Sequence, residues 1–225
     1  MARPRDNATP RTKSEVARQH IQEMILSGAA RAGDHITTRE ISEALGISET
    51  PVREAIRSLA AEGWLDLQAH FGSVVASIKS EQLAEIYAIR GALSATAIEL
   101  GGPMFDAARL DALADTLRAS ATAVVAHDVA AYTALNRRFH ALLSDTANTQ
   151  WTLKLLDALW VQTAAVGRGF EIIPQRMERS LDEHRAILAA VVARDFAGAA
   201  RLMVEHERLA GGELIAALNG TITGR

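Results

Sequence analysis

Apolar residues recur at helical spacing near the start of the chain. Over residues 14–26 they fall on one side of a helix, which predicts a helix that begins at a Ser14 cap and is closed by Gly28. The residues expected to face inward are Val16, Ile21, Ile25 and Leu26.

Two shorter helical patterns follow the break at Gly33-Asp34. The first begins with Thr37 or Thr38 as a cap and ends at Gly46, with Ile41, Ala44 and Leu45 facing inward. The second begins at Ser48 with a hydroxyl cap and carries Pro51 in its first turn, where the missing N–H costs nothing. Its inward residues are Val52, Ala55, Ile56 and Leu59. Two helices joined by a tight glycine-containing turn, after a supporting helix, form the helix-turn-helix pattern.

The period then changes from helical to alternating. Gly63 ends the third helix, residues 64–68 alternate between apolar and polar, and residues 69–72 turn the chain into a second extended segment over 73–78. Such a pair predicts a β-hairpin wing beside the helix-turn-helix.

From residue 80 to about residue 218 the pattern is helical throughout, with breaks near 101–103, 126–128, 147–149, 167–174 and 194–195. The predicted fold is therefore mainly α, with an N-terminal winged helix-turn-helix of three helices and a hairpin, followed by an all-α bundle of about six helices. The expected divisions are a disordered basic arm at 1–13, the winged helix at 14–78 and the helical domain at 79–225. Because the linker at 77–80 is short, we expect a defined relation between the two domains.

Composition narrows the possible chemistry. The chain is 48% hydrophobic and contains no cysteine, which excludes a disulfide framework, a thiolate metal site and a cysteine nucleophile. Any metal must be held by histidine, carboxylate or amide groups. No apolar run is long enough to span a bilayer, and the N-terminus lacks the apolar segment of a signal peptide. We therefore expect a soluble cytoplasmic protein with no membrane partner.

Charge argues against a protein that coats nucleic acid indiscriminately. The net charge is −3, and residues 1–79 hold as many basic as acidic side chains. The first thirteen residues differ, because Arg3, Arg5, Arg11 and Lys13 outnumber Asp6. Two interpretations of this arm stay open: it follows a DNA backbone or groove, or it is an ordinary solvated tail.

The third predicted helix carries residues suited to reading DNA. Ser48, Thr50 and Arg53 lie at its N-terminal end, which enters the major groove in such motifs. Arg53 can bind two acceptors of guanine, and Arg57, one turn later, is expected to contact the backbone. Arg39 occupies the position of a phosphate clamp, and His70 at the wing tip can enter a minor groove. The alternative is that these are solvated charges, with Arg53 or Arg57 paired to Glu49, Glu54 or Glu62.

The C-terminal half carries three histidines on apolar stripes of separate predicted helices. Asn136 lies four residues before His140, so both share one helix face, and His184 and His206 lie on two further helices. Three imidazoles and an amide oxygen can coordinate a divalent ion such as Zn²⁺, Ni²⁺ or Mn²⁺. The alternative is that each histidine is a hydrogen-bonded packing residue.

An enzyme and a non-catalytic helical scaffold are the rival functions. A metal with an open position can activate water. However, Glu183, Glu205 and Glu207 are adjacent in sequence to the histidines, so we expect them to point away from the ligand face and to leave the site without a general base. A scaffold would leave the winged helix unexplained. We therefore expect a regulator rather than an enzyme.

The stretch from Gly33 to Val75 strongly resembles the winged helix of the GntR superfamily. The motifs that carry the resemblance are Ser48-Glu-Thr-Pro-Val-Arg-Glu-Ala-Ile56, Leu59-Ala-Ala-Glu-Gly-Trp64 and Gly72-Ser-Val-Val75. The resemblance implies DNA contacts by Arg39, Thr50, Arg53 and His70. The family often has arginine where this chain has Glu49, so one contact is lost and a negative charge faces the DNA.

Residues 80–218 resemble the helical FCD-type ligand-binding domain of the FadR subgroup in the same superfamily. The motif Asn136-x-x-Phe-His140, then Glu183-His184 and His206, is similar to that domain's metal-binding set and implies a divalent metal held by Asn136, His140, His184 and His206. Many members have aspartate in place of Asn136, and glutamate is common in place of Ser94.

The same resemblance implies what the metal is for. It suggests a small organic or sugar acid as the effector, with Arg90 as a partner for its carboxylate, or alternatively Arg90 in an internal salt bridge or as a surface charge. It also implies a homodimer that binds palindromic operator DNA with an affinity set by the effector. Effector, metal, operator and the sign of regulation are not specified by the residues.

Overall fold

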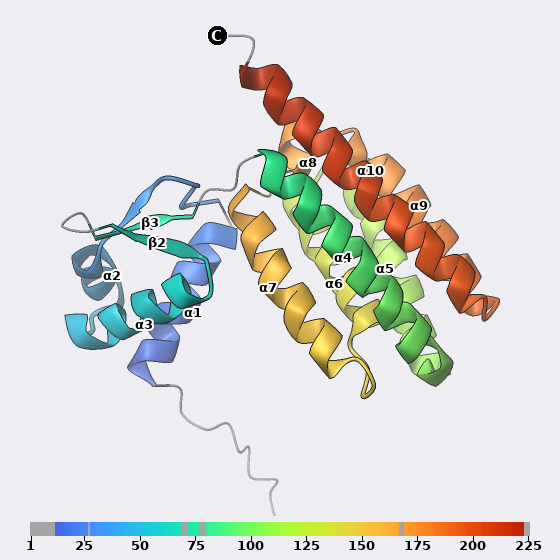
Figure 1. The fold of residues 1–225 in the computed structure, drawn as a ribbon, viewed down its shortest axis with the longest axis horizontal. Helices are drawn as coiled ribbons and strands as arrows, with labels where there is room; N and C mark the ends of the chain where they lie inside the picture. Colours follow the sequence, from blue (N-terminus) through green and yellow to red (C-terminus); the bar gives the residue numbers. More distant parts are fainter. Residues whose placement is uncertain (1–11, 27, 69–71, 77–79, 167–168, 223–225) are drawn as a thin grey trace, which may run out of the picture. The chain divides into compact units, whose positions relative to one another are not determined.

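The computed structural model describes all residues except 1–11, 27, 69–71, 77–79, 167–168 and 223–225. The chain forms two compact units, Met1–Ser77 and Ile78–Arg225. Figure 1 shows a small unit of helices and short strands and a larger unit of long helices. Most of the predicted N-terminal arm and the wing-tip residue His70 lie outside the described residues.

The first unit is a winged helix-turn-helix. Three helices, α1 (Lys13–Leu26), α2 (Thr38–Leu45) and α3 (Glu49–Ala61), accompany an antiparallel sheet of β1 (His35–Ile36), β2 (Leu65–Gln68) and β3 (Gly72–Val75) in the order β1-β3-β2. In the hairpin Leu65 pairs with Val75 and Gln68 with Gly72. The predicted wing is confirmed, and β1 is an addition because a two-residue strand is too short to show a period.

The caps of α2 and α3 differ from each other. Thr37 and Glu40 form a reciprocal capping box at the start of α2, and Gly46 ends this helix in the left-handed conformation, with φ 63°. Ser48 precedes α3 as predicted, but its hydroxyl makes no capping hydrogen bond, so the expected hydroxyl cap is wrong. The Ser48 hydroxyl is therefore not used by its own helix.

The predicted core positions of α3 are confirmed, because Val52, Ala55, Ile56 and Leu59 are all buried. Two inward positions are wrong. Val16 is exposed because the buried line of α1 runs through Ala17, Ile21 and Ile25, one position further along the helix. Ala44 is also exposed.

The second unit is all helical, and its elements match the predicted breaks. They are α4 (Ser80–Gly101), the 3₁₀ turn η1 (Gly102–Met104), α5 (Ala107–Val125), α6 (Val129–Ser144), α7 (Gln150–Val166), α8 (Gly169–Ile172), α9 (Arg176–Val192) and α10 (Phe196–Ile222). The six long helices are the six predicted ones, and α8 and η1 are short additions at expected breaks. The longest helix, α10, packs along α4 and against α9 (Figure 1).

Two corners of the bundle are built in the same way. His127 after α5 and Arg194 after α9 have left-handed backbones, with φ 51° and 59°. In each case the backbone N–H of the next residue, Asp128 or Asp195, donates a hydrogen bond to the carbonyl five residues earlier. The carboxylate of the same residue accepts a hydrogen bond from the backbone N–H three residues later, in the first turn of the following helix. These corners bring α6 and α10, which both carry candidate ligands, into antiparallel contact with their neighbours.

A membrane span is absent from the described part of the chain, where none of the helices combines sufficient length with sufficient apolar character.

Candidate DNA-reading helix and histidine cluster

Helix α3 buries one side and presents a polar face on the other. Thr50, Arg53 and Arg57 are exposed on the side opposite to its buried residues, and Ser48 is exposed at the N-terminal end. A helix that is locked on one side and polar on the other can enter a groove of DNA with its first turns. The predicted reading residues that lie on α3 therefore share one accessible surface.

Two of the predicted DNA-contacting arginines are paired with acidic residues of their own helices. Arg53 Nη2 lies 2.5 Å from Glu49 Oε2, and Arg39 Nε on α2 lies 2.8 Å from Glu43 Oε1. All four side chains are well exposed, and such pairs stabilise a helix by only about 0.3–0.5 kcal/mol. DNA phosphates or bases can therefore compete for both arginines, while Arg57 has no ion pair within the described residues.

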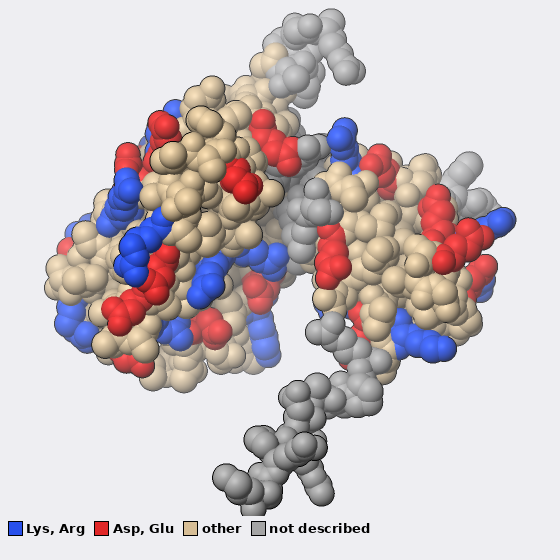
Figure 2. All heavy atoms as spheres, turned by 180° about the vertical axis from the view of Figure 1, so that it is seen from behind, with Lys and Arg blue, Asp and Glu red and all other residues tan. Residues whose placement is uncertain are grey.

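Charge is mixed over the surface. In the face shown in Figure 2, Lys and Arg lie among Asp and Glu over both units, and no large patch of one sign stands out. This agrees with the balanced charge of the N-terminal half. The face shown therefore offers no broad basic surface of the kind that binds nucleic acid without regard to sequence.

Three histidines meet in the interior of the helical unit. His140 on α6, His184 on α9 and His206 on α10 are 4%, 1% and 4% exposed. The Nε2 atom of His206 lies 3.3 Å from that of His184 and 3.2 Å from that of His140. One candidate ligand atom from each of the three lies within 4.8 Å of the others. The tertiary structure thus brings together residues that are up to 66 positions apart.

The spacing of these nitrogens suits a common metal ion. Ligands that sit 2.0–2.1 Å from one ion, at octahedral or tetrahedral angles, are about 2.9–3.4 Å from each other. The two Nε2–Nε2 distances fall in this range. Without an ion, the same distances fit ordinary N–H···N hydrogen bonds in which one ring donates and the other accepts.

Asn136 provides a further test of whether a metal fits. It lies one turn before His140 on α6, it is 8% exposed, and its Oδ1 has no hydrogen-bond partner among the described residues. A buried acceptor without a donor is costly and calls for a ligand or a water. Three imidazole nitrogens and an amide oxygen together form a donor set that divalent transition metals accept. The residues present therefore fit such an ion.

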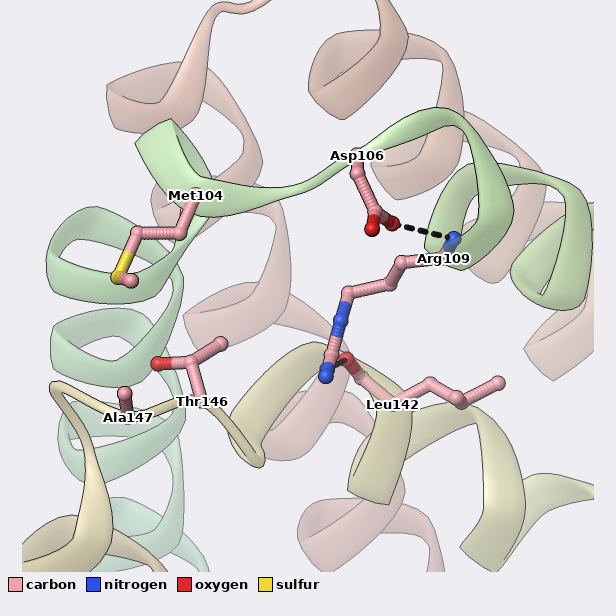
Figure 3. Close-up of a pocket in the computed structure, with 6 residues that line it drawn as sticks. All are labelled: Met104, Asp106, Arg109, Leu142, Thr146 and Ala147. Atoms are coloured by element: carbon pink, nitrogen blue, oxygen red, sulfur yellow. Dashed lines mark hydrogen bonds between the residues drawn. The ribbon is translucent and has the colours of Figure 1, made fainter.

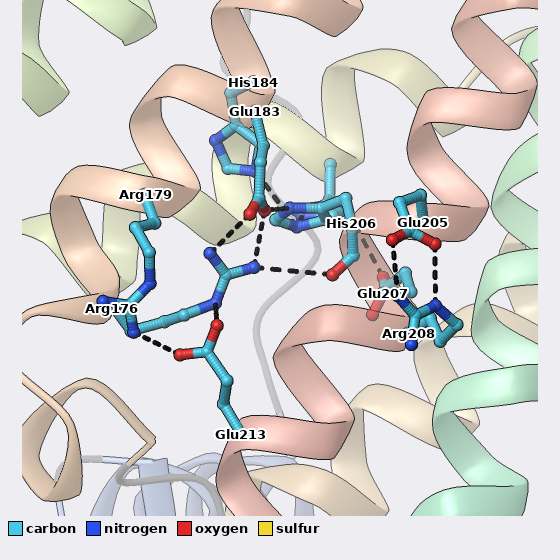
Figure 4. Close-up of polar contacts among 10 residues, drawn as sticks. Arg176, Arg179, Glu183, His184, Glu205, His206, Glu207, Arg208 and Glu213 are labelled. Atoms are coloured by element: carbon cyan, nitrogen blue, oxygen red, sulfur yellow. Dashed lines mark hydrogen bonds and ion pairs between the residues drawn. The ribbon is translucent and has the colours of Figure 1, made fainter.

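Glu183 reaches the cluster, which corrects the expectation that it would point away. Its Oε2 accepts a hydrogen bond of 2.6 Å from His206 Nδ1, and both of its oxygens accept from Arg176, at 2.8 and 2.5 Å (Figure 4). As expected, Glu183 leaves the face of its neighbour His184. The packing of α10 nevertheless brings His206 to the side on which Glu183 lies.

Glu207 is the second carboxylate beside the cluster. It is buried, its Oε1 accepts from Arg90 Nη2 at 3.0 Å, and the same oxygen lies 3.7 Å from His140 Nδ1. Glu183 and Glu207 thus lie behind two of the histidines, on the side away from the three Nε2 atoms. A carboxylate in this place holds a ligand histidine with its Nε2 lone pair free.

Arg90 lies in the internal salt bridge that was the alternative to effector binding. Besides Glu207, its guanidinium donates to Thr163 and stacks 3.6 Å from the ring centroid of Trp160. Its Nε and the Oε2 of Glu207 have no hydrogen-bond partner in the described structure. The pair therefore keeps one buried donor and one buried acceptor for a further group.

Burial sets the protonation of the cluster. Desolvation, and then the neighbouring histidine His206, hold the pKa values of His140 and His184 well below the usual value. Burial raises the pKa of Glu183, but the hydrogen bonds from His206 and Arg176 lower this pKa by more than burial raises it. The pKa of Glu183 is therefore below its usual value. Neutral imidazoles backed by an ionised carboxylate are the form that binds a cation.

A separate cavity of about 340 Å³ lies where η1, the start of α5 and the end of α6 meet (Figure 3). Its charged groups already have structural roles. Asp106 caps α5 by accepting from the backbone N–H of Arg109, and the Arg109 guanidinium donates to the Leu142 carbonyl at 2.6 Å. This cavity holds none of the predicted site residues.

Comparison with known proteins gives two family matches. Residues 13–75 match "Bacterial regulatory proteins, gntR family", and residues 85–209, more than half of the chain, match "FCD domain". The first match covers the winged helix, and the second covers all four predicted metal ligands.

Several curated regulators are similar to this chain over most of its length. The HTH-type transcriptional regulator McbR of Escherichia coli is 25% identical over 82% of this chain and 85% of its own. The probable D-xylose utilization operon transcriptional repressor of Paenarthrobacter nicotinovorans is 27% identical over 88% and 87%. YdhC of Bacillus subtilis, an uncharacterized regulator, is 30% identical to this chain over 61% of this chain and 62% of YdhC.

Solved structures show the same fold. The structure of E. coli McbR/YncC superposes with a TM-score of 0.82 at 23% identity, over 91% of this chain and 98% of that one. A GntR regulator from Rhodococcus gives a TM-score of 0.76 over 91% and 98%, at 18% identity. With a gntR-type winged helix followed by an FCD domain, the chain belongs to the GntR family of bacterial transcriptional regulators, in the group that carries an FCD domain.

Proposed function

We propose that this chain is an effector-responsive transcriptional regulator that reads operator DNA through α3 and holds a divalent metal ion at His140, His184, His206 and Asn136. The observation that carries the metal site is the convergence of three buried Nε2 atoms beside an unpartnered buried amide oxygen. When bound, the ion supplies open coordination positions to which an anionic effector can bind.

The effector we propose is a small organic or sugar acid. One similar regulator supports this class by its name, the gluconate operon transcriptional repressor of Bacillus licheniformis, at 24% identity. Because Arg90 Nη2 is paired with Glu207, the effector carboxylate should bind the metal and can reach Arg90 only through its unpartnered Nε unless that pair opens.

The helices offer a route from the site toward the DNA-binding unit. The ligands come from α6, α9 and α10, so a group that joins them changes how these helices pack. Helix α10 packs most extensively along α4, and α4 is the first element after the winged helix in the chain. We propose that effector binding changes the spacing of two winged helices in a homodimer on a palindromic operator.

The metal half of the proposal is tested by elemental analysis of the purified full chain. His184→Ala should lower bound metal well below one ion per chain, while His35→Ala, which removes an exposed histidine of β1, should leave it unchanged. Full metal content in His184→Ala would reject the site.

The regulatory half is tested by DNA binding upstream of the protein's own gene. Sequence-selective, salt-sensitive binding that weakens or strengthens on addition of sugar acids and small carboxylates supports the proposal. A thermal-shift screen of such acids, with and without a chelator, identifies the effector and its dependence on metal. Binding that does not distinguish between sequences would contradict it.

A further inference from the structure

The N-terminal turn of α3 holds an exposed ion pair of unusual placement for a DNA-binding surface. Glu49 is the first residue of the helix, and its carboxylate holds the Arg53 guanidinium at 2.5 Å, with 47% and 61% of the two side chains exposed. An acidic side chain at this place repels the phosphate backbone, so it weakens binding unless it makes a specific contact.

We propose that Glu49 reads cytosine, so that Arg53 and Glu49 together select a guanine and a cytosine at adjacent positions of the operator half-site. This rests on the proposed function of α3 as the reading helix. Arg53 has the planar fork that binds the O6 and N7 acceptors of guanine. Glu49, joined to it, presents acceptors only.

Base chemistry decides which partner a carboxylate takes. In the major groove cytosine offers an amino donor and no acceptor, whereas guanine and thymine offer acceptors that repel a carboxylate. Adenine offers a donor next to an acceptor, so it is a poorer match. A carboxylate that stays hydrogen-bonded to Arg53 can use its other lone pairs for the cytosine amino group.

Glu49 contributes only modestly to its own helix. A negative charge in the first turn stabilises an exposed helix by a small amount through the helix dipole, and the exposed i,i+4 pair with Arg53 adds little more. The role of Glu49 is therefore best tested on DNA.

Helix α2 offers a matched control. Glu43 holds Arg39 at 2.8 Å in the same i,i+4 arrangement, and both side chains are exposed, but this pair lies on the helix that is expected to clamp phosphate. Glu43→Gln frees an arginine in the same way as Glu49→Gln. Freeing Arg53 alone can change only the preference for guanine, so a lost preference for the neighbouring cytosine in Glu49→Gln requires a base contact by Glu49 itself.

The experiment is selection of binding sites from random duplex DNA by the full-length protein, its Glu49→Gln variant and its Glu43→Gln variant. The wild type should enrich cytosine at one position next to the guanine read by Arg53. In Glu49→Gln this cytosine should be lost by about 5- to 100-fold in favour of adenine, which glutamine binds through two hydrogen bonds. Glu43→Gln should raise affinity for all sequences alike and keep the cytosine.

Circular dichroism spectra and melting temperatures establish that both variants are folded. The same enriched site for wild type and Glu49→Gln would overturn the assignment of Glu49, as would a uniform rise in affinity equal to that of Glu43→Gln. If the wild type enriches no sequence at all, the proposed function of α3 fails and the inference falls with it. A lost cytosine preference with the rest of the site intact supports the inference alone.

Discussion

The hydrogen bond between Glu183 and His206 should control how tightly the cluster binds metal. In Glu183→Gln the side chain keeps its shape but loses its negative charge. In the wild type, Glu183 Oε2 lies 2.6 Å from His206 Nδ1, and the two carboxylate oxygens accept two hydrogen bonds from Arg176. Removing a carboxylate behind a ligand histidine typically costs 10- to 100-fold in metal affinity. This corresponds to about 1.4–2.7 kcal/mol, and the near-complete burial of His206 and Arg176 favours the upper part of the range.

The assay is a competition titration with a chelator of known affinity, using Zn²⁺, Ni²⁺ and Mn²⁺ in turn. Glu205→Gln is the matched control, because Glu205 also flanks a ligand in sequence but is exposed and paired with Arg208 (Figure 4). Glu205→Gln should bind metal like the wild type. The urea midpoint of each metal-free variant separates weaker metal binding from a weaker fold. Equal dissociation constants for Glu183→Gln and wild type would refute the reasoning.

Three further predictions concern reading, stability and titration. Arg53→Ala should weaken operator binding by about 1–3 kcal/mol and relax base preference at one position, as measured by binding to single-base operator variants; unchanged discrimination would remove Arg53 from the reading surface. Glu207→Ala should lower the free energy of unfolding by about 3–5 kcal/mol in urea titrations, because it leaves the buried Arg90 charge unpaired, and a loss below about 1 kcal/mol would contradict this. Burial raises the pKa of Tyr132 to about 12 and also raises that of Tyr87, the only other tyrosine. Since the pKa of an unfolded tyrosine is about 10, the contribution of Tyr132 to stability, about 2–3 kcal/mol, should be complete below pH 10 and lost as the pH rises toward 12. Tyrosinate absorbance that appears with a midpoint near pH 10 in the folded protein would exclude this.

Local features of the chain were determined by the sequence alone. The capping signals at Thr37 and Gly46, the apolar spacing of α3 and the corners at 126–128 and 194–195 all act over a few residues, so they could be recognised without a structure. Even here errors arose where a signal was weak. The burial of Ala17 in place of Val16 depends on which side of α1 meets α3, a fact of packing rather than of period.

The histidine cluster was predicted as a set of residues, but only the tertiary structure decided that they converge. Periodicity places each histidine on the apolar side of its own helix and says nothing about the rotation of α6, α9 and α10 relative to one another. The same limit explains Glu183 and Glu207. Each leaves the face of the histidine beside it in sequence and meets a histidine of a neighbouring helix, which no one-helix argument can show.

Arg90 depended in the same way on long-range packing. From sequence it was equally suited to an effector, an internal salt bridge or solvent, because its position on α4 leaves its partner undefined. Packing of α10 along α4 brings Glu207 to it across 117 residues. Helix period and capping depend on residues a few positions apart, so the sequence determines them. Contacts between charged groups and metal ligands of different helices depend on how whole helices pack, which only the tertiary structure defines.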